Sequence, residues 1–195
     1  IAAWRQEAGR LVSILSVAAL VGAGAYAVHY LCAGTDASAF DGLYRADAFG
    51  SFAKILIYFA AAVSLMIAPK ALEKMCAMRA EYPVLIILAA VGMGVMVSAT
   101  DLLTLYIGLE LNSLAAYVLA SFARNNGRSA EAGLKYFVLG ALASGILLFG
   151  MSLLYGFTGS TNFDTIGKVM TGEISMGLIF GLVFVLSGLA FKISA

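Results

Sequence analysis

The sequence has few of the residues that water-soluble proteins place at their surfaces and in their turns. Charged residues make up 12% of the 195 residues and only two residues are proline, whereas 62% are hydrophobic. A soluble domain of this length cannot bury so much apolar surface in its core, so a large part of that surface must face lipid. The composition therefore excludes an ordinary water-soluble domain and predicts an integral membrane protein.

Residues that form disulfides or bind metals are also scarce. The chain has two cysteines, Cys32 and Cys76, and a single histidine, His29. The two cysteines are expected at opposite membrane faces, and they lack the Cys-x-x-Cys spacing of a metal site. No metal site is predicted. Because haem, flavin and iron–sulfur ligand spacings are missing, a quinone-binding redox subunit is the least favoured interpretation.

The chain is instead rich in apolar runs that are long enough to cross a bilayer, which takes roughly 20 residues. The runs lie at about 11–31, 49–68, 82–100, 102–122, 134–157 and 175–195. The ten-residue alternating segments of membrane β-barrels are missing. We therefore predict an all-α integral membrane fold with six transmembrane helices in residues 1–195 and no soluble domain. Because the chain begins at Ile1 rather than Met and stops within an apolar run, we expect a fragment of a longer protein.

Positive charge is concentrated on one side of this six-helix arrangement. When the chain is threaded alternately through the membrane, Arg45 and Lys168 fall on one side. The other side carries the remaining loop cations, namely Arg5, Arg10, Lys70, Lys74, Arg79, Arg124 and Arg128. Short loops rich in Lys and Arg stay inside. The second side is therefore predicted to face the cytoplasm of a bacterium or the matrix of a mitochondrion.

One carboxylate lies inside an apolar run. Glu110 is in the middle of residues 102–122, where an ionised side chain costs about 2.5–3.5 kcal/mol even on lenient insertion scales. Tyr106, Ser113 and Tyr117 share a helix face with it, and a polar face at membrane depth should turn toward protein or trapped water. We interpret Glu110 as a proton-translocation residue with a supporting polar stripe. The alternative, a hydrogen bond that only ties helices together, remains open.

Three lysines within the runs are candidate partners for Glu110. Lys54 lies near the outer end of its run, so its long side chain can reach the membrane interface. Lys135 follows Glu131 by one helical turn, so a local surface pair and a functional role are equally compatible with its position. Lys192 comes after the nearly unbroken apolar or small residues 175–191 and has no acidic neighbour on its own helix. It is therefore expected to pair with Glu110.

A buried acid and base of this kind can move protons. Burial disfavours the charged form of both groups and proximity of opposite charges favours it, so small rearrangements shift a proton on or off each group. A lysine can act as a relay, whereas an arginine stays charged. The set is therefore predicted to be a proton path.

Four stretches of the sequence resemble a known family. They are Asp-Leu-Leu-Thr-Leu-Tyr-Ile-Gly-Leu-Glu-Leu-Asn-Ser-Leu-Ala at 101–115, Glu-Ala-Gly-Leu-Lys-Tyr-Phe-Val-Leu-Gly-Ala-Leu-Ala-Ser-Gly at 131–145, Tyr-Gly-Phe-Thr-Gly-Ser-Thr-Asn-Phe at 155–163 and Phe-Lys-Ile-Ser-Ala at 191–195. These strings resemble the subunit N family of respiratory complex I, the proton-translocating NADH:quinone oxidoreductase. The resemblance is specific over about 99–195 and rests mostly on hydropathy before that.

The resemblance implies a fold and a role. Members have an antiporter-like core of two inverted helix bundles, each with a broken helix, and the break nearest this sequence would lie just past Ala195. Glu110, Lys135 and Lys192 match the family's proton-translocation residues. The chain itself would hold no cofactor, while partner subunits would carry NADH, flavin, iron–sulfur clusters and quinone. The implied partners are other membrane subunits of complex I, the lipid bilayer, protons and internal water, with no nucleic acid. The implied location is a bacterial inner (plasma) membrane or a mitochondrial inner membrane.

Two other functions use the same charged helices. A cation/proton antiporter subunit would depend on an ion gradient rather than on NADH. A structural membrane scaffold would use the charges only to pack helices. Neutral replacements of Glu110 and Lys192 would then leave proton pumping unchanged.

Overall fold

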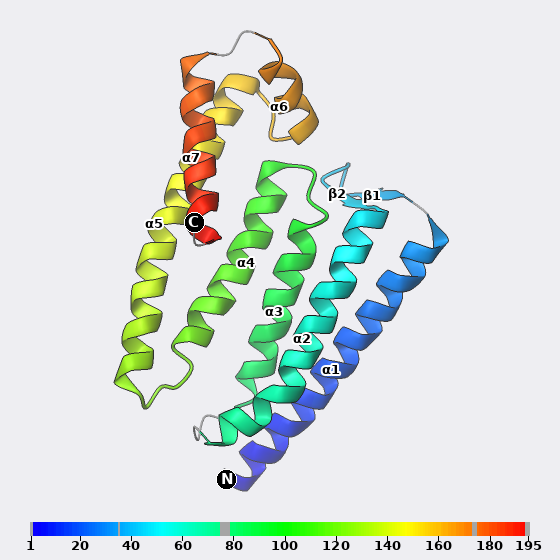
Figure 1. Ribbon diagram of the computed structural model, residues 1–195, viewed down its shortest axis with the longest axis vertical. Coiled ribbons are helices and arrows are strands. Elements are labelled where there is room, and N and C mark those ends of the chain that lie inside the picture. Colours follow the sequence, from blue (N-terminus) through cyan, green and yellow to red (C-terminus); the bar gives the residue numbers. More distant parts are fainter. Residues whose placement is uncertain (1, 35, 75–78, 173–174, 194–195) are drawn as a thin grey trace.

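The computed structural model describes residues 2–34, 36–74, 79–172 and 175–193, and within them the chain is built almost entirely of helices (Figure 1). In chain order the elements are α1 (Ala2–Ala33), β1 (Ala37–Ala39), β2 (Tyr44–Ala46), α2 (Ala48–Lys74), α3 (Glu81–Met96), α4 (Leu102–Ala120), α5 (Gly127–Thr158), α6 (Phe163–Met170) and α7 (Met176–Lys192). Six of these helices, α1 to α5 and α7, each overlap one of the six apolar runs of the sequence. The expected all-α membrane class is therefore confirmed.

The expected count of six spans is higher than the helix lengths support. In the described part of the chain, four helices are long and apolar enough to cross a membrane, in the segments Gly9–Ala33, Ala48–Pro69, Leu102–Ala120 and Gly127–Thr158. The other two apolar helices, α3 and α7, have 16 and 17 residues. Helix α3 is shorter than its apolar run because residues 98–100 leave the helix and pair with other segments.

The long helices lie side by side (Figure 1). Helix α1 packs on α2, α3 on α4 and α5 on α7, and α4 also contacts α5. One apolar core joins α1, α2 and α3 around Leu65 and Ala90. A second core joins α4, α5, α6 and α7 around Leu147. Many other large apolar side chains are exposed, as lipid-facing surfaces require.

Glycines allow the closest helix contacts. A Cβ on Gly92 of α3 would lie 2.7 Å from the carbonyl oxygen of Gly108 on α4. A Cβ on Gly150 of α5 would lie 2.7 Å from the backbone nitrogen of Val185 on α7. Small residues of this kind are how helices approach one another in membranes, where apolar burial gives little drive for association.

Backbone hydrogen bonds join three loops at one end of the molecule. The antiparallel strands β1 and β2 form a hairpin, and Arg45 N–H donates to the Ser98 carbonyl at 2.8 Å. In the next connection Leu102 N–H donates to Thr161 O at 2.9 Å, and Phe163 N–H donates to Thr100 O at 3.1 Å. The start of α4 is therefore fastened both to the hairpin and to the connection between α5 and α6.

The two ends of the helix bundle carry the loops that the charge pattern separates. The hairpin with Arg45 and helix α6 with Lys168 lie at the same end, whereas the α4–α5 connection with Arg124 lies at the other (Figure 1). Helix α6 occupies the loop between the last two runs, and the hairpin was not anticipated from the sequence. Cys32 is an exposed free thiol, and Cys76 lies outside the described residues.

Candidate functional site

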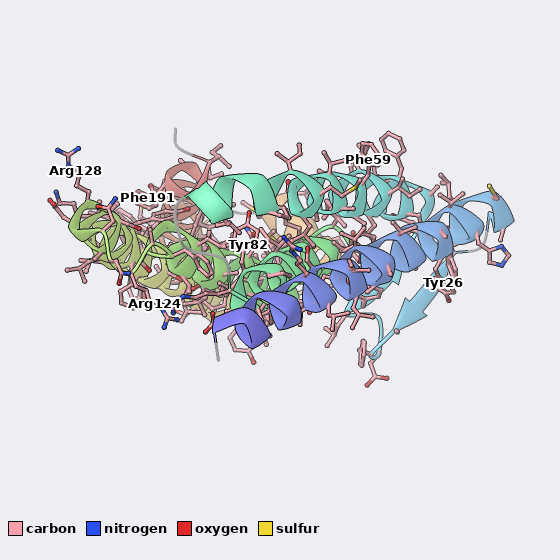
Figure 2. All side chains as sticks on the ribbon, turned by 90° about the horizontal axis from the view of Figure 1, so that it is seen from below. Tyr26, Phe59, Tyr82, Arg124, Arg128 and Phe191 are labelled. Carbon is pink, nitrogen blue, oxygen red and sulfur yellow. The ribbon has the colours of Figure 1, made fainter. Side chains whose placement is uncertain are left out.

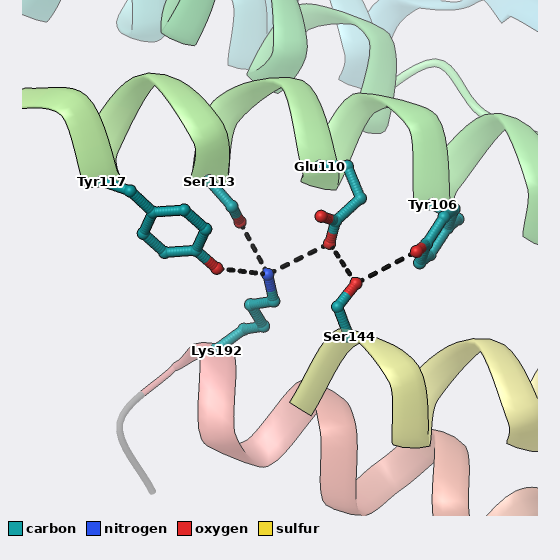
Figure 3. Close-up of polar contacts among 6 residues, drawn as sticks. All are labelled: Tyr106, Glu110, Ser113, Tyr117, Ser144 and Lys192. Carbon is teal, nitrogen blue, oxygen red and sulfur yellow. Dashed lines mark hydrogen bonds and ion pairs between the residues drawn. The ribbon is translucent and has the colours of Figure 1, made fainter. Parts of the chain in front are cut away.

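Helix α4 presents the predicted polar stripe on one face. Its start is set by Asp101, which is 1% exposed and whose carboxylate accepts hydrogen bonds from the backbone N–H groups of Leu103 and Thr104. This is the usual N-terminal cap of a helix. Figure 3 shows that Tyr106 and Glu110 on α4 point toward α5 and α7, as do Ser113 and Tyr117. The expected face is therefore real, and it points toward protein.

Lys192 at the end of α7 reaches this face. Its ammonium donates to Glu110 Oε1 at 3.1 Å, to Ser113 Oγ at 2.8 Å and to the Tyr117 hydroxyl at 3.1 Å (Figure 3). The nitrogen also lies 5.6 Å from the centre of the Tyr117 ring. A protonated lysine has three N–H donors, so these acceptors satisfy all of them. The expected Glu110–Lys192 pair is present in the structure.

Ser144 on α5 completes the cluster, and the sequence analysis missed it. Its hydroxyl donates to Glu110 Oε1 at 2.6 Å and lies 3.0 Å from the Tyr106 hydroxyl. Because a hydroxyl has one hydrogen, and Ser144 uses its own on Glu110, the Tyr106 hydroxyl is the donor to Ser144. In the sequence, Ser144 is only a hydroxyl residue within an apolar helix, and this pattern does not show which neighbouring helix the side chain faces.

The cluster is largely removed from the surface. The Lys192 and Glu110 side chains are 12% and 22% exposed, while Ser113, Tyr117 and Ser144 are buried. Removing one partner of a buried pair costs about 3–5 kcal/mol, because the other charge is left without compensation. We refer to Tyr106, Glu110, Ser113, Tyr117, Ser144 and Lys192 as the Glu110–Lys192 cluster.

The Tyr117 hydroxyl is placed by packing against α5. A Cβ on Gly140 would lie 2.1 Å from this hydroxyl, so the space that Gly140 leaves is filled by the phenol. The Tyr117 ring also meets the Tyr136 ring edge-on, with 4.7 Å between centroids. These contacts fix the hydroxyl that Lys192 uses.

The other two lysines lie elsewhere. Lys135 on α5 is 70% exposed and forms an ion pair with Glu131 at 2.5 Å, which is the local pair that its spacing allows. The structure does not bring Lys135 into the Glu110–Lys192 cluster. Lys54 on α2 donates to the Tyr44 hydroxyl near the hairpin, where the sequence analysis expected it to reach the membrane interface.

The two carboxylate oxygens of Glu110 have different surroundings. Glu110 Oε1 accepts two hydrogen bonds, from Lys192 and Ser144. Within the described residues, Glu110 Oε2 has no hydrogen-bond partner. One carboxylate oxygen is thus held by a positive charge and a hydroxyl, and the other is available to water or a proton.

Comparisons with known proteins identify the family. The profile described as "NADH:quinone oxidoreductase/Mrp antiporter, TM" matches residues 99–195, which contain the whole Glu110–Lys192 cluster. The NADH-quinone oxidoreductase subunit N of Erythrobacter litoralis is 62% identical over 192 residues, or 97% of this chain and 39% of that protein. The chain therefore spans about a third to two fifths of the length of the curated relatives it matches.

Solved structures share the arrangement of helices. A chain of respiratory complex I from Thermus thermophilus, solved with bound aureothin, matches with a TM-score of 0.78 and 30% identity, covering 94% of this chain and 38% of that chain. A chain of the Mrp complex from Dietzia sp. matches with a TM-score of 0.73, covers 93% of this chain and 36% of that chain, and at 22% identity shows the fold alone.

The sequence resemblance is confirmed by these matches. The relatives are bacterial, and the chain is accordingly a multi-pass protein of a bacterial inner membrane. By sequence and by fold, it belongs to the subunit N family of antiporter-like membrane subunits of NADH:quinone oxidoreductase.

Proposed function

We propose that the chain provides a proton-transfer site in the membrane part of an NADH:quinone oxidoreductase, with Glu110 and Lys192 as its central groups. The observation that carries the proposal is the buried contact between them, 3.1 Å from Nζ to Oε1. An intramembrane ion pair of this kind marks an ion path more often than a structural tie. The family assignment also supports a role in proton transfer.

The proposed step is the opening and closing of this pair. When the pair is closed, the Lys192 ammonium compensates the Glu110 carboxylate. When Lys192 withdraws, a buried carboxylate is left without a counter-charge, and such a site favours the neutral, protonated form. Glu110 would then take up a proton, and the return of Lys192 would expel it. The signal that opens the pair is electrostatic or conformational and comes from electron transfer in other subunits.

Lys135 is proposed as the next group of the relay. It lies nine residues before Ser144 on α5, or about 13 Å of helix rise, so internal water has to connect it to the cluster. Tyr136, its neighbour in sequence, packs edge-on against Tyr117. A displacement of the Tyr117 side chain would therefore move Tyr136, the residue that follows Lys135.

The redox chemistry is assigned to partners. NADH, flavin, iron–sulfur clusters and quinone would bind in other subunits, and this chain would couple quinone reduction there to proton movement.

Other membrane subunits would cover part of the exposed apolar surface. We also propose that α3 and α7 cross the membrane with the other helices as one unit, since Lys192 at the end of α7 lies at the depth of Glu110.

The test compares Glu110→Gln and Lys192→Met in the full-length subunit within the assembled complex. Each is expected to lower proton translocation per NADH oxidised by about tenfold or more, because a neutral side chain at either position removes the opposite charge whose approach and withdrawal shift the proton affinity of the other group. The double variant should assemble better than either single one, since no buried charge is left alone. Asp164→Asn, an exposed carboxylate on α6, is the control. Undiminished pumping in both single variants, with intact assembly, would make the charges a structural scaffold.

A cation/proton antiporter is the second candidate, because the matching profile covers Mrp antiporters as well. The two functions differ in their energy source. Purified protein in sealed vesicles would exchange sodium for protons without NADH if it were an antiporter. Proton movement that requires NADH and quinone supports the first candidate.

A further inference from the structure

A cavity at the hairpin end of the molecule lies apart from the Glu110–Lys192 cluster. Its volume is about 330 Å³, and it is bounded by α1, the β1–β2 hairpin and the first turns of α2. The cluster, in contrast, is built by α4, α5 and α7. Cavities of this size are large enough for a small ligand or for the polar end of a larger one.

The wall of the cavity combines one cation with aromatic and small apolar side chains. Lys54 of α2 lines it together with Tyr26 and Tyr30 of α1, Tyr44 of β2 and Tyr58 of α2. The rest of the wall is formed by alanines of α1 and of the hairpin and by two serines, Ser38 and Ser51. Tyrosine is typical of membrane interfaces, where the ring faces apolar groups and the hydroxyl faces polar ones. The cavity therefore accepts a molecule that has both an anionic and an apolar part.

The charge of Lys54 is not balanced by an acid in the part of the chain that the structure describes. Its ammonium donates to the Tyr44 hydroxyl at 2.5 Å and lies 4.6 Å from the centre of the Tyr44 ring. The nearby Asp36 carboxylate is instead 3.8 Å from Arg45. Two N–H donors of Lys54 thus remain for a ligand, and one formal positive charge faces the cavity.

Lys54 can reach the level of lipid phosphates through its long side chain. It lies six residues after the first residue of α2, or about 9 Å of helix rise, and its four-carbon stem can carry the ammonium back toward the hairpin end of the helix. Tyr26 is 66% exposed and lies on the side of α1 toward the hairpin (Figure 2). The cavity is therefore reached from the lipid as well as from the surface.

We propose that this cavity binds the phosphate-bearing headgroup of an anionic phospholipid from the outer leaflet. Lys54 would hold the phosphate oxygens, tyrosine hydroxyls would donate further hydrogen bonds, and the alanine and tyrosine walls would contact the glycerol and the first acyl carbons. Free phosphate has the same anionic chemistry. It would gain nothing from the apolar wall, which is why the lipid is the better fit.

The test uses the full-length subunit in the purified complex, placed in phosphatidylcholine vesicles that contain a photoreactive phosphatidylglycerol. After illumination, labelled peptides from residues 23–46 are measured by mass spectrometry. Lys54→Met and Lys54→Gln should lower this labelling by about tenfold or more, because a hydrogen bond to a charged group is worth at least that factor. Lys54→Arg, which keeps the charge, should retain most of it. Lys168→Met, an exposed lysine at the same end of the molecule, should leave it unchanged.

The outcomes separate the possible occupants. Labelling that depends on Lys54 and resists an excess of inorganic phosphate supports the lipid site. Labelling that inorganic phosphate removes would mean an anion site without lipid preference and would overturn the proposal. Equal labelling in the parent and in both neutral variants, or no labelling in the parent because another protein segment fills the cavity, would overturn it as well.

Discussion

At the residue scale, the Lys192 ammonium is the centre of the site because each of its three donors has a different acceptor. Losing any one acceptor leaves a buried N–H group unsatisfied, which costs more than the hydrogen bond itself gains. The acceptors come from a single helix, α4, at successive turns. A small rotation of that helix therefore changes all three contacts together.

Ser144 is expected to matter for coupling, because its hydroxyl is the second donor to Glu110 Oε1. Ser144→Ala should slow NADH-driven proton translocation by about tenfold or more, since hydrogen bonds to charged groups are worth about 1.5–3 kcal/mol. The measurement is the rate of vesicle acidification at a fixed rate of NADH oxidation. Ser152→Ala is the matched control, because that hydroxyl on the same helix bonds only to the carbonyl of Phe149. Equal effects of the two substitutions would remove Ser144 from the proton path.

Much of the cluster could be predicted at this scale, and the reason is geometric. The spacing of Tyr106, Ser113 and Tyr117 around Glu110 places them on one helix face whatever the rest of the chain does. Lys192 followed from the lack of an acid on its own helix. Ser144 could not be found in the same way, because the sequence does not specify how far one helix is shifted along another.

At the scale of elements, the pairing of α5 with α7 places Lys192. Gly150 and Gly181 let the two backbones approach, and Leu147 is fully buried in the core around them.

The end of helix α3 could not be predicted from the apolar pattern of the sequence. Its apolar run extends to residue 100, but the helix ends at Met96 because Ser98 and Thr100 make backbone hydrogen bonds to the hairpin and to the start of α6. The sequence carries no local signal for these long-range bonds.

Gly150→Ala is expected to destabilise the subunit by about 1–3 kcal/mol, because the new methyl group has to push the α7 backbone away. It should also weaken proton pumping, since α7 carries Lys192. Thermal unfolding of the purified complex and vesicle acidification measure the two effects. Gly145→Ala on the same helix is the control, because a Cβ there meets no atom within 4 Å. It should be neutral or stabilising by about 0.5–1 kcal/mol. A Gly150→Ala complex as stable as the parent would show that α5 and α7 can move apart without a loss of stability.

At the scale of the whole molecule, the basic loop residues are concentrated at one end of the helix bundle, as the alternating order of the helices predicts. The end with the hairpin and α6 carries few basic residues. The α4–α5 connection with Arg124, and the first turn of α5 with Arg128, lie at the opposite end (Figure 1). Because basic loops stay in the cytoplasm, the hairpin end is expected to face the periplasm.

Cysteine labelling in intact cells tests this orientation. In a background with Cys32→Ala and Cys76→Ala, Ser38→Cys and Thr171→Cys should react with a membrane-impermeant maleimide. Asn125→Cys should react only after the cells are opened. All three positions are exposed in the structure, so access depends on the side of the membrane alone. The reverse pattern would invert the orientation and place the cavity beside Lys54 in the inner leaflet.

The backbone hydrogen bonds between the start of α4 and the α5–α6 connection hold these two segments in a fixed position relative to one another. If α7 tilts against α4 about that fixed end, its displacement grows with distance from it. Glu110 lies about 12 Å along α4 from Leu102, and its 3.1 Å contact with Lys192 passes the limit of a hydrogen bond after a shift of about half an ångström. A tilt too small to disturb the fastened loops is therefore enough to break the ion pair.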